Sequence, residues 1–182
     1  MTKRQNPPQE RSKKRGGKFF PALCNILGTL LLLLVIVLLL PLGLPKLMGY
    51  EVYNVVSGSM EPTIPVGSMI IVKPMQGSEI AEKDIIVFHT SEEAVVTHRV
   101  MENHEVEGEF ITKGDANDAE DLTTVLYANL IGRVTKHIPK LGDIMTHITT
   151  PLGRVYLLGV ALCGLLFNIL AGRLRMEKDE GS

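Results

Sequence analysis

An uncharged, apolar segment near the start of the chain constrains its fold more than any other feature. It runs from residue 19 to residue 45, is bounded by Lys18 and Lys46, and consists only of Leu, Val and Ile between residues 30 and 40. About 20 such residues span a hydrocarbon core of roughly 30 Å as a helix. A cleavable secretory signal has an apolar core of only about 7 to 15 residues. We therefore expect residues 19–45 to form a retained transmembrane helix.

A second apolar segment lies near the other end of the chain. It extends from Val155 to Gly172 without a charge, between Arg154 and Arg173. At about 1.5 Å of rise per residue it reaches about 27 Å, which suffices to cross a membrane with little tilt. We expect residues 151–172 to form a second transmembrane helix. The alternative is a hydrophobic helix that lies against the domain or in the membrane plane.

The charges that flank these segments predict an orientation. Residues 1–18 carry seven Lys and Arg side chains against Glu10 alone, and Arg173, Arg175 and Lys178 follow the second apolar segment. Basic flanks favour the cytoplasmic side of a membrane. We expect cytoplasmic tails at 1–18 and 173–182 and a domain at 46–150 on the extracytoplasmic side of a two-pass cell-membrane protein. In a eukaryote the corresponding membrane would be that of the endoplasmic reticulum.

The segment between the two apolar runs has the size of one compact domain. Residues 46–150 contain 16 acidic and 8 basic side chains, so no basic surface is available for phosphates and we expect no nucleic-acid partner. Cys24 and Cys163 both lie in the apolar runs, which leaves the domain without a disulfide framework or a cysteine zinc site. We expect neither a metal nor a cofactor.

The domain reads as mainly β. Short β-branched runs with period-two alternation, separated by turn signals, predict strands rather than helices. The segment 102–109, rich in glutamate, is expected to be an exposed hairpin or loop. The predicted strands are 51–56, 68–72, 84–88, 94–100, 110–113 and 130–134.

One short turn could carry chemistry. Ser57-Gly58-Ser59 lies just beyond the first membrane segment, where a hydroxyl is poorly placed for a core but well placed at a membrane surface. A serine hydroxyl needs a neighbouring base to become a nucleophile. His98, in a β-branched strand pattern, could serve, because imidazole titrates near neutrality and can accept and return a proton.

A third group, a carboxylate, is needed to orient such an imidazole. Four carboxylates in the segment 112–121 are candidates: Asp115, Asp118, Glu120 and Asp121. This segment begins like a calcium loop but lacks the glycine that such a loop requires. The ordinary alternatives are that Ser57-Gly58-Ser59 is a surface turn and His98 a structural strand histidine. The remaining histidines, His89, His104, His137 and His147, show no ligand spacing.

Three ordered motifs resemble the boxes typical of type I signal peptidases. They are Asn54-Val55-Val56-Ser57-Gly58-Ser59-Met60-Glu61-Pro62-Thr63, Thr97-His98-Arg99-Val100 and Thr112-Lys113-Gly114-Asp115. The version here is similar to the endoplasmic-reticulum type, also found in archaea and some Gram-positive bacteria, in which histidine replaces the usual lysine. The resemblance implies that Ser59 is the nucleophile, His98 the base and Ser57 part of the oxyanion hole. It also implies Asp121 as the partner of His98, with Asp115 supporting the site.

The resemblance implies an activity as well. A membrane-bound serine endopeptidase would remove signal peptides from secreted preproteins, cutting after small residues through an acyl-enzyme. Its partners would be preproteins and membrane lipid. The resemblance does not decide whether accessory subunits are needed. The residues that line the substrate pockets stay open, and the segment 64–72 is expected to form a sheet edge. Two alternatives are a catalytically inactive membrane scaffold of the same fold and a relative that cleaves itself or a regulator. Relatives of the second kind are soluble, which disfavours it here.

Overall fold

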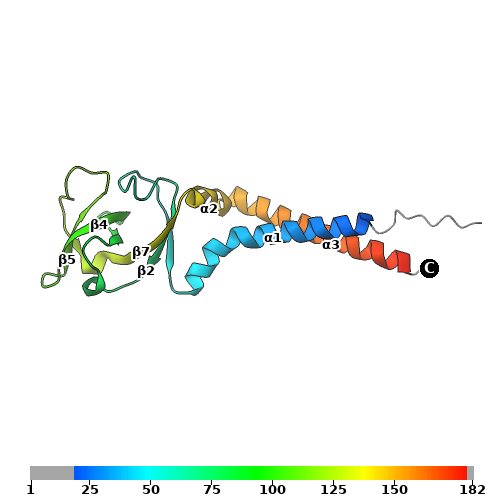
Figure 1. Cartoon of the computed structure of the whole chain (residues 1–182), viewed down its shortest axis with the longest axis horizontal. Coiled ribbons are helices and arrows are strands. Elements are labelled where there is room, and N and C mark those ends of the chain that lie inside the picture. Colours follow the sequence, from blue (N-terminus) through cyan, green and yellow to red (C-terminus); the bar gives the residue numbers. More distant parts are fainter. Residues whose placement is uncertain (1–18, 180–182) are drawn as a thin grey trace, which may run out of the picture. The chain divides into compact units, whose positions relative to one another are not determined.

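The computed structural model describes residues 19–179, so the tail expected at 1–18 and residues 180–182 of the tail expected at 173–182 lie outside the described residues. The chain divides into two compact units. One contains the apolar helices up to Ile36 and from Leu158 onward, and the other contains residues 37–157. The mainly β fold class with an apolar helix at each end is confirmed (Figure 1).

The helical unit contains most of two helices that are long and apolar enough to cross a membrane. Helix α1 spans Phe19–Leu47 and helix α3 spans Pro151–Asp179, so α3 extends beyond the apolar run predicted from the sequence. The two helices approach closely at Gly28 and Gly164. A β-carbon on Gly28 would lie 2.6 Å from the carbonyl oxygen of Gly164, which no larger residue could accommodate without a shift. Small residues of this kind allow close packing of membrane helices.

The second unit is built on one antiparallel sheet of seven strands in the order β1-β2-β7-β3-β4-β5-β6. A nine-residue helix, α2, follows the last strand and packs on β1 and β2. The strands are β1 Glu51–Asn54, β2 Met69–Lys73, β3 Ile85–His89, β4 Val95–His104, β5 Glu109–Lys113, β6 Val125–Leu126 and β7 Leu130–Ile138, and α2 spans Leu141–Thr149.

All six predicted strands are present. The elements that the sequence did not predict have local causes. Strand β6 has only two residues and α2 only nine, which is too short for a clear periodic signal in the sequence. The glutamate-rich segment 102–109 is the end of a hairpin, because β4 continues to His104 and β5 begins at Glu109. The expectation that 64–72 forms a sheet edge is wrong, since β2 pairs with β1 on one side and β7 on the other.

Two apolar clusters form the core of this unit. The first contains Val55, Met60 and Ile64 with residues of β2 and β3, and the second contains Phe88, Val100 and Phe110 with neighbouring apolar residues. Burial of this apolar surface is the main favourable term in folding. The clusters matter for function because the serine turn is anchored in the first and His98 packs beside the second.

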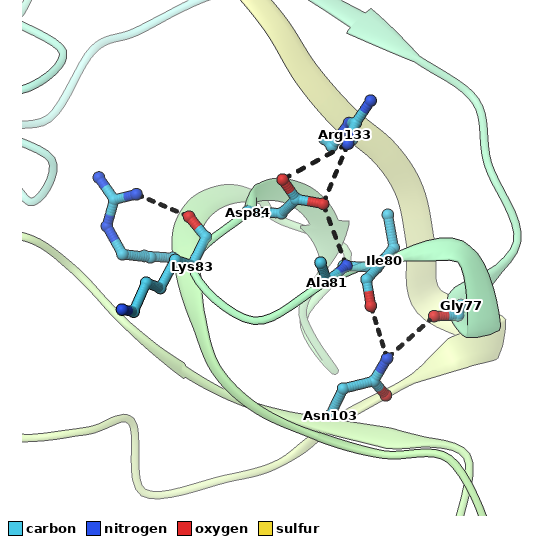
Figure 2. Close-up of polar contacts among 8 residues, drawn as sticks. Gly77, Ile80, Ala81, Lys83, Asp84, Asn103 and Arg133 are labelled. Atoms are coloured by element: carbon cyan, nitrogen blue, oxygen red, sulfur yellow. Dashed lines mark hydrogen bonds and ion pairs between the residues drawn. The ribbon is translucent and has the colours of Figure 1, made fainter.

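Polar contacts tie the segment before β3 to the rest of the sheet (Figure 2). Asp84 accepts hydrogen bonds from the guanidinium of Arg133 at 3.2 Å and from the backbone N–H of Ala81 at 3.1 Å. The amide of Asn103 donates to the carbonyl oxygens of Ile80 at 2.7 Å and Gly77 at 3.3 Å. These hydrogen bonds satisfy backbone N–H and carbonyl groups that lie outside the strands. They also fix the short 3₁₀ helix Gly77–Glu79 against β4.

Candidate active site

The turn that carries Ser59 is fixed by its apolar neighbours. Val55 and Met60 are buried in the first core cluster, at 8% and 1% exposure, on either side of Ser57-Gly58-Ser59. Backbone bonds close the turn, from Glu61 N–H to the Gly58 carbonyl at 3.0 Å and from Ile64 N–H to the Met60 carbonyl at 2.8 Å. The two buried side chains hold the segment down, so the serines between them stay at the surface in a defined conformation.

Two contacts define the immediate surroundings of Ser59. Its hydroxyl oxygen lies 3.5 Å from that of Ser57. Its carbonyl oxygen accepts a hydrogen bond of 2.9 Å from the backbone N–H of Ala116. Gly114 passes so close that a β-carbon there would lie 2.7 Å from the Ser59 carbonyl oxygen, which explains a glycine at this position. The serine turn is therefore bonded directly to the acidic loop that follows β5.

His98 is held in the middle of β4, where it pairs with Ile86 of β3. Its residue exposure is 8%, and the Phe88 ring lies edge-on to the imidazole with 6.3 Å between ring centres. The sheet and this aromatic neighbour restrict the direction of the imidazole. A rigid, largely buried imidazole is suited to proton transfer because its geometry is set in advance.

Asp121 provides the carboxylate next to this imidazole. Its Oδ2 lies 2.6 Å from Nδ1 of His98 and accepts a second hydrogen bond of 2.6 Å from the hydroxyl of Thr112. The backbone N–H of Asp121 also donates to the Thr112 carbonyl at 2.8 Å. Because an ionised carboxylate can only accept, Nδ1 carries the hydrogen and Nε2 is left as the basic nitrogen of the neutral ring.

Asp115 has a different partner. Arg99 binds it in a two-point ion pair, with Nε to Oδ1 at 2.8 Å and Nη2 to Oδ2 at 2.6 Å. The third arm of the guanidinium, Nη1, donates to the carbonyl oxygen of Lys83 at 2.7 Å. The hydrogen bonds from Arg99 hold the pKa of the Asp115 carboxyl below its ordinary value. Asp115 therefore ties the acidic loop to β4 beside His98 rather than contacting the imidazole.

A cavity of about 260 Å³ opens next to Ser59. It is bordered on one side by the segment from Tyr53 to Met60 and on the other by Val95, Val96 and Thr97, immediately before His98. Strand β4 pairs with β5 only from Arg99 onward. Within residues 19–179, the β5-facing edge of β4 from Val95 to His98 thus has no strand beside it. The cavity combines an open strand edge with both serines.

The other two candidate carboxylates, Asp118 and Glu120, are exposed. The histidines without ligand spacing are His89, His137 and His147, which are exposed, and His104. His104 pairs with Glu102 at the far end of β4. The described residues 19–179 contain no cluster of three or more His, Cys, Asp or Glu side chains that could hold a metal ion.

The sequence pointed to five of the residues at this site but missed three others. Thr112, Arg99 and Ala116 lie within or beside the motifs quoted above, yet their contacts depend on how the loop after β5 folds back. Thr112 is fully buried despite being polar, at 0% exposure. A buried polar residue normally has a specific hydrogen-bond partner, but the sequence does not reveal that burial.

Ser59 shares its cavity with Thr97, the neighbour of His98, and His98 is paired with Asp121. Serine, histidine and aspartate are the side chains typical of serine peptidases. Comparison with known proteins agrees with this class. Residues 26–119, just over half of the chain, match the family described as "Signal peptidase, peptidase S26". The chain belongs to this family. The matched region includes Ser59, His98 and Asp115, whereas Asp121 lies two residues beyond its end.

Individual relatives come from bacteria and eukaryotes. Signal peptidase I W of Bacillus subtilis is 36% identical over 122 residues, covering 61% of this chain and 64% of the relative. The signal peptidase complex catalytic subunit SEC11 of Clavispora lusitaniae is 32% identical over 108 residues, covering 52% and 63%. Human SEC11C is 34% identical over 85 residues, covering 43% and 44%. The chain thus spans less than two thirds of the length of these relatives.

Proposed function

We propose that this chain is a membrane-bound serine endopeptidase that removes signal peptides from secreted preproteins. The observation that carries the proposal is the contact of 2.6 Å between His98 Nδ1 and Asp121 Oδ2, on a strand whose preceding residue, Thr97, lines the same cavity as Ser57 and Ser59. Family membership supports the same activity. The alternative is a catalytically inactive scaffold of this fold, which would have no use for a base, its carboxylate and a nucleophile together.

The proposed reaction proceeds through an acyl-enzyme. Ser59 Oγ attacks the scissile carbonyl carbon while Nε2 of His98 takes the hydroxyl proton. The C–N bond then breaks, and the imidazolium returns the proton to the leaving amine. Water, activated by the same imidazole, hydrolyses the ester and regenerates Ser59. Asp121 keeps the imidazole oriented and stabilises its charged form during both steps.

Stabilisation of the oxyanion falls to the serine turn. The Ser57 hydroxyl lies 3.5 Å from the Ser59 hydroxyl, within reach of the oxygen of a carbonyl attacked by Ser59. We propose that Ser57 and backbone N–H groups of the turn donate to this oxygen. The loss of one such donor typically reduces kcat by about 100-fold to 1000-fold.

The cavity beside Ser59 suits an extended peptide. The open edge of β4 at Val95–Thr97 offers backbone groups to which a substrate segment can pair as an added strand. We propose that the end of a signal peptide occupies this groove. A space of about 260 Å³ lined by Tyr53, Met60 and Val96 favours small side chains near the cleaved bond.

The proposed location follows from the two apolar helices. With α1 and α3 spanning the cell membrane and the basic residues at both ends in the cytoplasm, the β domain lies on the extracytoplasmic side. A preprotein held by its own apolar signal presents the bond to be cut at the same surface. Confinement of enzyme and substrate to one thin layer raises their effective concentration.

The test is processing of a synthetic preprotein by the purified full chain in lipid vesicles, without added subunits. We expect Ser59→Ala and His98→Ala to abolish cleavage, and His137→Ala, at an exposed position on β7, to leave it unchanged. The cleavage rate should also fall on the acid side as the imidazole becomes protonated. Full cleavage by Ser59→Ala would refute the nucleophile. An inactive wild type that still binds the preprotein would favour the scaffold alternative.

A further inference from the structure

Helix α2 carries an apolar face that the domain does not cover. Met145 and Gly142 are buried against the sheet, and Thr146 Oγ1 accepts a hydrogen bond of 2.7 Å from the amide of Asn54. Ile144 is 47% exposed, and Ile148, one turn later on the same face, is only partly buried. The apolar arc of α2 is therefore wider than the part in contact with the sheet.

The position of α2 places this face where the domain joins both apolar helices. Thr149 ends α2 and Pro151 begins α3. The hydroxyl of Thr150, the single residue between them, donates to the His147 carbonyl at 2.7 Å and accepts from the Gly153 N–H at 3.0 Å, which fixes the corner. On the other side, Leu42 of α1 borders the same cavity of about 140 Å³ as Met145 and Thr149.

The charges around α2 complement an anionic surface. Lys136 and Lys140 precede the helix, Arg154 follows it, and all three side chains are exposed. Asp143 is the acidic residue within α2 itself. An exposed apolar face next to basic side chains is the pattern of a helix that lies in a membrane interface. Basic side chains close to an anionic bilayer are attracted to its headgroups.

We propose that α2 is a membrane-interface helix, with Ile144 and Ile148 inserted at the headgroup boundary of an anionic bilayer. The helix thereby holds the β domain at a fixed height and tilt over the lipid. This inference rests on the proposed membrane location of α1 and α3, but not on peptidase activity. It adds a third point of attachment to the two membrane helices.

The absence of tryptophan from the chain allows a direct test. Single substitutions would place one fluorophore at each site in the full chain, reconstituted in phosphatidylcholine–phosphatidylglycerol vesicles with bromine near the headgroup end of the acyl chains. Ile144→Trp and Ile148→Trp report on the α2 face. Val106→Trp, at a 95% exposed aliphatic position on the hairpin tip, is the matched aqueous control. Leu33→Trp, in the middle of α1, reports membrane insertion with bromine deep in the chains.

We expect several-fold stronger quenching of Ile144→Trp and Ile148→Trp than of Val106→Trp, with emission shifted to shorter wavelength. Quenching should weaken when phosphatidylglycerol is left out. If Leu33→Trp is quenched but both α2 variants behave like Val106→Trp, the inference is wrong and the membrane location stands. If Leu33→Trp is not quenched, both are wrong. The α2 variants could instead show a wavelength shift that grows with the protein-to-lipid ratio, without any quenching. That result would identify a second copy as the occupant of the α2 face and overturn the proposal.

Discussion

Two histidines on the same strand, six residues apart, show how the surroundings separate a candidate catalytic group from a surface group. His98 has a side-chain exposure of 10%, and its partner Asp121 is bonded in turn to Thr112. His104 is 36% exposed and contacts Glu102 at 2.9 Å and Glu109 at 3.9 Å.

Each histidine therefore has an acidic neighbour. Burial of His98 and the second hydrogen bond on its carboxylate distinguish the two ends of β4. A buried imidazole with a doubly bonded partner keeps one geometry, whereas exposed long side chains exchange partners and are screened by solvent.

The largest expected effect separates the two ends of β4 directly. His98→Ala should lower preprotein cleavage by at least about 1000-fold, because loss of the base in a serine–histidine–aspartate arrangement has effects of this order or larger. The cleavage rate of His104→Ala should stay within about twofold of the wild type, since this exposed side chain has no contact with the cavity beside Ser59. Cleavage rates of the two purified variants decide the matter. Equal losses would mean that the proposed distinction between the two histidines is wrong.

The next prediction tests whether the second hydrogen bond on Asp121 matters. Thr112→Val removes the hydroxyl and leaves Asp121 with one fewer donor, so kcat should fall by roughly tenfold to a hundredfold with KM unchanged. Thr112→Ser keeps the hydroxyl and should restore most of the rate. Steady-state kinetics on one preprotein measures kcat and KM separately for each variant. An increase in KM alone would show that Thr112 shapes the groove instead of positioning Asp121.

A smaller effect concerns the structural ion pair. Arg99→Met leaves Asp115 without its two-point partner and should lower the free energy of unfolding by about 2 kcal/mol at neutral pH. Arg99→Lys, which keeps the charge but loses the two-point geometry, should lie between Arg99→Met and the wild type. Thermal unfolding of the purified chains gives the comparison.

The pH dependence of this effect has a definite sign. Arg99 lowers the pKa of Asp115 in the folded state. The contribution is therefore fully present above the unfolded pKa of about 3.9 and is lost as the pH falls through the lower folded value. The difference between the wild type and Arg99→Met should shrink in strong acid. A difference that is constant from neutral pH into strong acid would contradict the assignment of the stabilisation to this carboxylate.

The smallest effect is expected at the exposed end of β4. The hydrogen bond from His104 to Glu102, with help from Glu107 and Glu109, raises the pKa of His104 above its ordinary value. The pair contributes below the unfolded pKa of about 6.5, and the contribution is lost as the pH rises through the folded value. Glu102→Gln should lower the titration midpoint of His104, which nuclear magnetic resonance can measure. Glu92→Gln, in the exposed loop before β4, is the control.

Many features of this protein follow from local sequence patterns. The apolar runs predict the two helices that could cross a membrane, because length and hydrophobicity suffice for that inference. Alternating β-branched runs predict the six main strands. The strand edge at 64–72 was predicted wrongly, because β-pairing joins segments far apart in the chain, such as β2 and β7. Such pairing leaves no local signal.

At the site, too, some features follow from the local sequence and others from tertiary structure. The motifs around Ser59 and His98, together with a short list of carboxylates, could be read from the sequence, since each residue type has its own chemistry. Residue chemistry alone did not choose among the carboxylates, because the pairing depends on how the acidic loop folds back, and only the family resemblance implied Asp121. Tertiary structure decides that Asp121 meets His98 and Thr112 while Asp115 meets Arg99. Strand pairing brings Thr112 and Arg99 beside the loop, and only then does each carboxylate acquire its partner.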